Sequence, residues 1–132
     1  MEVTAKARFI RMSPRKVRLV IDVVRGLSVE AAEAQLAFMR KAAARPVLKL
    51  LQSAVANAVH NHKMTPASLK IKAITADGGP ALDRWRARAF GRAAAIKHRT
   101  THIAITLIAH KPLVSVSATK AALVKKTVAT TS

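Results

Sequence analysis

The 132-residue sequence contains no cysteine and no tyrosine, and its aromatic residues are one Trp and three Phe. The absence of cysteine excludes disulfide bonds, thiol nucleophiles and cysteine-ligated zinc, and it agrees with a reducing cytoplasm. No apolar run approaches the roughly 20 residues that a membrane-spanning helix needs. The first twelve residues, MEVTAKARFIRM, carry a charge every few positions, so no secretory signal is expected.

Acidic residues are also scarce. Six Asp and Glu face 24 Lys and Arg, which gives a net charge of +18. A folded domain with this excess repels itself unless a polyanion neutralises it, so the expected partner is nucleic acid or an anionic membrane. The Lys and Arg divide into 12 in residues 1–66 and 12 in residues 67–132, so the charge belongs to the whole chain and not to one arm.

Hydrophobic periodicity predicts that the chain begins with a strand and a helix. Residues 2–10 alternate with the period of a half-buried strand, whose inward face would be Val3, Ala5, Ala7 and Phe9. The spacing then becomes helical, with Ser13 as the N-cap, Pro14 in the first turn and Gly26 after the last turn. The inward stripe of this helix would be Val17, Val20, Ile21 and Val24.

Two more helices are predicted before the strand pattern returns. The first helix begins after Ser28, and the residues expected to face the core are Ala32, Leu36 and Met39. The second covers residues 45–62, and its inward side would be Leu48, Leu51, Val55 and Val59, with Leu50 and Ala54 beside them.

Period two returns in residues 69–77 and 101–110, which predicts two further strands. The first would face inward with Leu69, Ile71 and Ala73, and the second with Ile103, Ile105 and Leu107. The motif DGGP, residues 77–80, favours a turn between them. The last twenty residues, Leu113–Ser132, are biased to Ala, Val, Thr, Ser and Lys, and we expect a disordered basic tail there.

The most unusual segment is RWRARAFGRAAAIKHR, residues 84–99, in which six of sixteen residues are Arg or Lys and none is acidic. If the flanking strands pair antiparallel, this segment is a long hairpin or a long loop. Arginine at every second residue favours a ribbon with Arg84, Arg86 and Arg88 on one face, and Gly91 suits its turn. A two-stranded ribbon is marginal in water, so such a ribbon implies surrounding phosphate. A mobile basic surface loop explains the composition equally well.

The start of the first helix is also basic. Arg15, Lys16 and Arg18 lie in its first turns, where cations oppose the helix dipole at a cost of about a few tenths of a kcal/mol each. Free backbone N–H groups with added cations form a phosphate site. A solvated charged face is the alternative interpretation.

Three stretches resemble a known family. They are RMSPRKVRLVIDVVRG from Arg11, AAARPVLKLLQSAVANAVHNH from Ala42, and RARAFGRAAAIKHRTTHIAITL from Arg86. Together they resemble the bacterial form of large-subunit ribosomal protein L twenty-two, over residues 5–110. The last stretch carries the most specific motif: Arg88, Ala89, Gly91 and Arg92, then nine residues, then His102 and Ile103 with Ile105 and Leu107.

The resemblance implies an α+β fold in which three helices pack on a small three-stranded antiparallel sheet, with a long protruding β-hairpin at about residues 78–102. Residues 1–112 would form a single RNA-binding domain and residues 113–132 the tail. The implied function is a structural constituent of the cytoplasmic large ribosomal subunit, in which the hairpin passes through ribosomal RNA and its tip lines the exit tunnel. The implied partners are large-subunit ribosomal RNA, neighbouring ribosomal proteins and the nascent peptide. No cofactor, membrane or homo-oligomer is expected.

The resemblance also implies site residues. The tip would comprise Arg88, Ala89, Phe90, Gly91 and Arg92. This sequence departs from the family at Asp83, Ala87 and Phe90, where a basic or amide residue, a proline and a basic residue are usual. The residues expected to contact RNA are Arg8, Arg11, Ser13, Arg15, Lys16, Arg18, Arg25, Arg84, Arg86, Arg88, Arg92, Lys97, His98 and Arg99.

Other classes of function fit the residues less well, and no enzyme or metal site is expected. His60 and His62 would point roughly 200° apart on a helix, and no carboxylate lies near the other histidines to orient them. Membrane-surface helices usually carry large aromatic anchors, which are scarce here. A free-standing nucleic-acid-binding regulator is the alternative, although no helix stands out as base-reading and the charge covers every element.

Overall fold

The computed structural model describes residues 1–109, which contain three helices and three strands. The elements in order are β1 (Glu2–Ile10), α1 (Pro14–Val24), α2 (Val29–Phe38), α3 (Ala44–His62), a short 3₁₀ helix (Pro66–Ser68), β2 (Leu69–Ala87) and β3 (Ala93–Ala109). The tail expected at residues 113–132, and the strand end expected at His110, lie outside the described residues.

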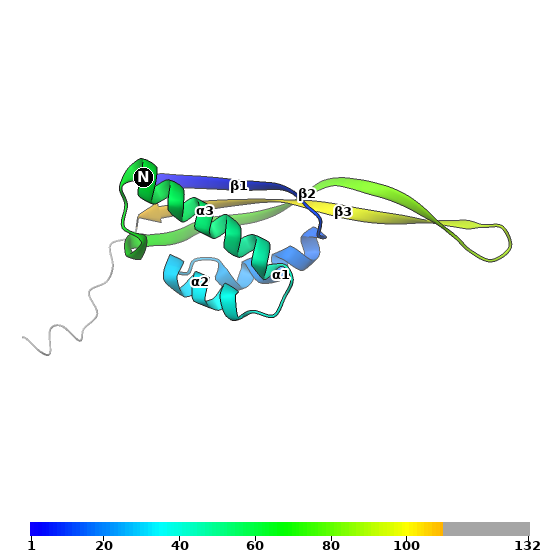
Figure 1. Ribbon diagram of the computed structural model, residues 1–132, viewed down its shortest axis with the longest axis horizontal. Helices are drawn as coiled ribbons and strands as arrows, with labels where there is room; N and C mark the ends of the chain where they lie inside the picture. The colour runs from blue at the N-terminus through cyan, green and yellow to red at the C-terminus, as the bar shows by residue number, and fades with distance from the viewer. Residues whose placement is uncertain (110–132) are drawn as a thin grey trace, which may run out of the picture.

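The sheet has the order β1-β3-β2, and β3 pairs antiparallel with both neighbours. The helices pack beside one end of the sheet, and β2 and β3 run on beyond them as a long two-stranded ribbon (Figure 1). The expected α+β fold, three helices with a three-stranded antiparallel sheet and a protruding hairpin, is confirmed.

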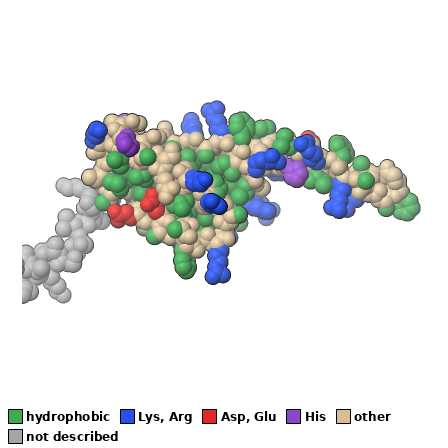
Figure 2. Space-filling view, viewed as in Figure 1, with side chains coloured by type: hydrophobic (Ala, Val, Ile, Leu, Met, Phe, Trp, Pro, Cys, Tyr) green, Lys and Arg blue, Asp and Glu red, His purple; other side chains and the backbone are tan. Residues whose placement is uncertain are grey.

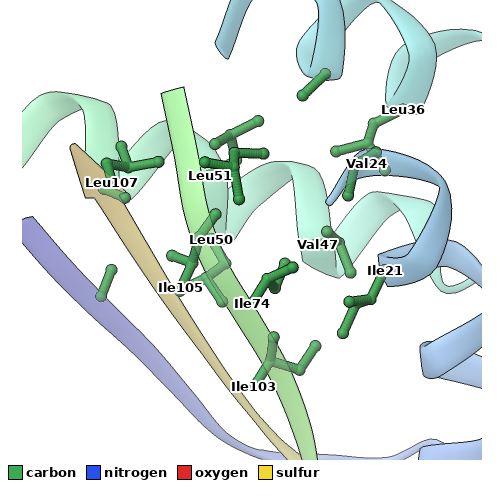
Figure 3. Packing of buried hydrophobic residues seen from close by; sticks show 14 of the residues in the cluster. Ile21, Val24, Leu36, Val47, Leu50, Leu51, Ile74, Ile103, Ile105 and Leu107 are labelled. Carbon is green, nitrogen blue, oxygen red and sulfur yellow. The ribbon is translucent and has the colours of Figure 1, made fainter. Parts of the chain in front are cut away.

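The core lies between the helices and the near half of the sheet. The predicted stripe of α1 is fully buried, and it meets side chains from α3, β2 and β3 (Figure 3). The predicted inward residues Ala32 and Leu36 of α2 are buried, and Met39 is half-buried. Along β3 burial alternates from Thr101 to Leu107, because the helices cover only one face of the sheet.

The buried face of α3 differs from the predicted one. Leu51 is buried as expected, but Leu48, Val55 and Val59 are only half-buried. The apolar face of this helix is wide, so the spacing of its residues did not define the centre of the inward face. Small side chains let the helix approach the sheet closely, and the buried set is Ala44, Val47, Leu50, Leu51, Ala54 and Ala58.

Two β-bulges overturn the predicted alternation in the strands. In β1 the register shifts between Ala7 and Ile10, and Phe9 takes a positive φ of 57° and is exposed instead of buried. In β2 the register shifts between Ile71 and Ala73, so Ala73 faces outward and Ile74 takes the buried place. One inserted residue reverses the face of every residue that follows it.

A third bulge lies where the ribbon leaves the domain. The DGGP motif is not a turn: it lies inside β2, where the register shifts between Gly78 and Ala81. Opposite this shift the buried Thr100 hydroxyl donates a hydrogen bond to the Pro80 carbonyl at 2.7 Å.

Thr100, Thr101 and His102, which we call the root of the ribbon, bind three separate segments. Besides the Thr100 bond, the fully buried Thr101 hydroxyl donates to the Met12 carbonyl at 2.6 Å. The Phe9 backbone N–H donates to His102 Nδ1 at 3.0 Å, and the two rings meet edge to face. The root therefore fixes the ribbon to β1 and to the β1–α1 connection.

Substitution of Gly79 tests how tightly the root is packed. A Cβ at Gly79 would lie 2.5 Å from Thr100 Oγ1 and 3.0 Å from His102 Nε2, whereas a Cβ at Gly78 would meet nothing within 4 Å. Gly79→Ala should lower the free energy of unfolding by about 1–3 kcal/mol in urea titration, because relief of the clash breaks the Thr100 bond. Gly78→Ala is the matched control and should be neutral or slightly stabilising; equal effects at the two positions would contradict this packing.

Candidate nucleic-acid interface

The ribbon presents two chemically different faces. Its register is unbroken from Ala81 to Ala87, so residues paired across β2 and β3 share a face. The first, the arginine face, comprises Leu82, Arg84 and Arg86 with their partners His98, Ile96 and Ala94. The second, the alanine face, comprises Ala81, Asp83, Trp85 and Ala87 with their partners Arg99, Lys97, Ala95 and Ala93. Arg84 and Arg86 share one face, as predicted, whereas Arg88 lies beyond the last strand pair, in the tip turn.

The tip is a tight turn at the far end of the ribbon. The Arg88 N–H donates to the Arg92 carbonyl at 2.8 Å, and the Arg92 N–H donates to the Ala89 carbonyl at 3.4 Å. Gly91 has a positive φ of 67°, as predicted, and Phe90 has a φ of 58° with its side chain 97% exposed. Positive φ at both central residues is the requirement of a type I′ turn, which favours Gly and Asn over a bulky residue.

A basic groove of about 650 Å³ lies at the base of the ribbon. Its walls come from the β1–α1 connection, the first turns of α1, the α2–α3 connection and the end of the ribbon nearest the domain. No acidic side chain lines it, and its cations are Arg11, Lys16, Lys41, Lys97, His98 when protonated, and Arg99. The fold thus brings together Ser13 and five other predicted site residues from both ends of the chain.

The helix end at this groove is suited to an anion. Ser13 and Lys16 line the groove, α1 has no acidic residue in its first turn, and the Ser13 hydroxyl makes no capping hydrogen bond. The helix dipole at this end therefore acts together with the surrounding cations.

Lys41 is a groove residue that the sequence did not reveal. It lies in the short connection between α2 and α3, and no periodicity or motif marks this position.

Two of the predicted RNA-contacting residues, Arg18 and Arg25, also bind other groups of the protein itself. The Arg18 guanidinium donates to the Ala76 carbonyl at 3.1 Å from Nε and 2.9 Å from Nη2, and Arg25 pairs with Asp22 at 3.1 Å. Arg8 and Arg15 are exposed and lie outside the groove.

Positive charge at this interface has little compensation from the protein. Within residues 1–109 the ion pairs are Arg25–Asp22 and Lys72–Glu2, and neither belongs to the ribbon or to the groove. Figure 2 shows Lys and Arg along the ribbon and over the adjacent domain, while the acidic side chains on this face lie mainly at the opposite end. The positive charge of the ribbon and the groove is therefore available to a polyanion.

Two further features bear on function. No cluster of His, Asp or Glu in the part of the chain that the structure describes could hold a metal ion. Over the same residues, every helix is too short or too polar to span a bilayer.

Fold and surface together define a class of protein: a small, basic α+β protein whose exposed ribbon and groove suit a polyanion. The sequence model of the family described as Ribosomal protein L22p/L17e matches residues 5–108. The chain belongs to this family of ribosomal proteins, whose members are structural and not catalytic.

Curated relatives support the same assignment, and each is named large ribosomal subunit protein uL22. The protein of Desulfitobacterium hafniense strain Y51 is 50% identical over 107 residues, which cover 81% of this chain and 94% of the relative. The Thermus thermophilus protein is 52% identical, with 81% and 95% covered, and the Deinococcus radiodurans protein is 51% identical, with 81% and 79% covered.

The contribution of Lys41 can be measured with a fragment of large-subunit ribosomal RNA. Lys41→Ala should weaken binding and reduce the slope of log Kd against log salt by about one, because one phosphate contact is lost. Lys49→Ala removes an exposed cation of α3 outside the groove and serves as the control. Equal losses from the two variants would show that the groove has no special role.

Proposed function

We propose that this protein is a structural constituent of the large ribosomal subunit that binds large-subunit ribosomal RNA through the groove and the ribbon. The observation that carries the proposal is the positive charge that runs from the groove along the arginine face of the ribbon, where no acidic side chain lies. The domain, taken as residues 1–112, would support assembly of the subunit in the cytoplasm without a cofactor or a second copy of the chain.

In this proposal the two parts of the interface have different roles. The groove and the start of α1 hold RNA phosphates at the surface of the domain. The ribbon enters between RNA segments, and the roughly ten residues from Ala81 to the tip reach about 30 Å at about 3.3 Å per residue. Contacts to phosphate and sugar position the protein, and arginine guanidinium groups also stack on exposed bases.

The tip would then face the passage of the nascent peptide, with Arg88–Arg92 forming part of its wall. The family resemblance supports this role, and the exposure of the whole turn agrees with a surface that meets another molecule. Neighbouring ribosomal proteins would contact the exposed surface of the domain. A free-standing regulator would instead prefer one DNA sequence over competitor DNA, whereas this protein should co-sediment with large subunits.

Salt dependence tests the role of the ribbon directly. The double variant Arg84→Ala/Arg86→Ala should bind a large-subunit ribosomal RNA fragment more weakly and reduce the slope of log Kd against log salt by about two. Its free energy of unfolding should be unchanged, because both side chains are exposed. Arg45→Ala/Lys49→Ala, which removes two exposed cations of α3, is the control and should keep the original slope. A slope unaffected in the ribbon variant would argue against the proposal.

A further inference from the structure

Trp85, the single tryptophan of the chain, lies uncovered on the ribbon. Its side chain is 72% exposed, although an indole is the largest apolar surface that a residue can bury. Cross-strand pairing usually covers such a ring, but the partner of Trp85 is Ala95 and the next pair toward the tip is Ala87–Ala93. These methyl groups are too short to cover an indole, so the protein leaves its ring face open.

The side chains around Trp85 suit both the base and the phosphate of a nucleotide. Toward the tip, the methyl groups of Ala87 and Ala93 form a low apolar shelf that does not obstruct approach to the indole. Toward the domain, β3 contributes Lys97 and Arg99 to the same face. An aromatic ring in these surroundings can stack on a base, while the neighbouring cations bind the phosphates of the same strand.

We infer that Trp85 is a stacking platform for an unpaired RNA base, which lies on the alanine face while Lys97 and Arg99 meet its phosphates. This inference rests on the proposed function, and it adds that the RNA at this part of the ribbon is unpaired. An apolar protein partner is the weaker choice, because one indole among alanines offers little area and all four pairs on the other face and at the tip carry Arg or His. Asp83, the one acidic residue of the ribbon, lies opposite Lys97. Arg99, the next cation on this face toward the domain, has Ala81 as its partner and can bind phosphate.

The single tryptophan makes the inference directly measurable by intrinsic fluorescence. Single-stranded oligoadenylate should quench the emission of Trp85 by stacking on the indole. Heparin, a polyanion without bases, should bind the same cations and leave the emission nearly unchanged. Quenching of equal depth by both polyanions would overturn the inference.

Substitutions separate stacking from apolar contact. Trp85→Leu should weaken oligoadenylate binding by about 5- to 100-fold, and Trp85→Phe should recover part of that loss because it keeps a flat ring. Heparin affinity should be the same in all three proteins. Phe38→Leu is the matched control: Phe38 is 90% exposed at the end of α2, away from the ribbon, and its loss should change neither affinity.

The outcomes distinguish this inference from the proposed function. If oligoadenylate and ribosomal RNA bind with a steep salt dependence but Trp85→Leu binds them as tightly as the original protein, the stacking role is wrong and the proposed function stands. If neither RNA binds in a salt-dependent way, the proposed function itself fails.

Discussion

A two-stranded ribbon has no interior, and this constraint governs the rest of the molecule. The backbone ladder between β2 and β3 satisfies the main-chain groups of the ribbon, but nearly every side chain beyond Gly79 is exposed on one face or the other. Hydrophobic burial therefore contributes little to its stability, and like charges along it oppose its formation. The ribbon depends on its attachment at the root and, in the proposed function, on a polyanion around its faces.

The attachment at the root is made by consecutive residues of the central strand. Thr100, Thr101 and His102 bind β2, the β1–α1 connection and β1 in turn, so β3 links the ribbon rigidly to the domain. The residues that precede them, Lys97–Arg99, line the groove beside α1. Groove and ribbon thus share one strand and form a continuous basic surface.

The sequence was sufficient to predict the elements with strong local signals. The stripe and the caps of α1 predicted that helix closely, and the period of the arginines predicted the two faces of the ribbon. Bulges were not predictable, because alternation does not record an inserted residue, and Phe9, Ala73 and the DGGP motif were therefore misassigned. The groove was predicted only in part. Lys41 joins it through tertiary packing, and the bonds from Arg18 to Ala76 depend on the approach of α1 to β2.

Amide hydrogen exchange tests the central claim most directly, because it compares ribbon and domain within one molecule. In the free protein, amides of Thr101–Leu107 should exchange slowly and those of residues 82–98 should exchange much faster, since only the former lie over the core. In the large subunit, or with bound ribosomal RNA, the amides of residues 82–98 should become as slow as those of the domain. Equal protection of ribbon and domain in the free protein would show that the ribbon needs no polyanion and would contradict the account.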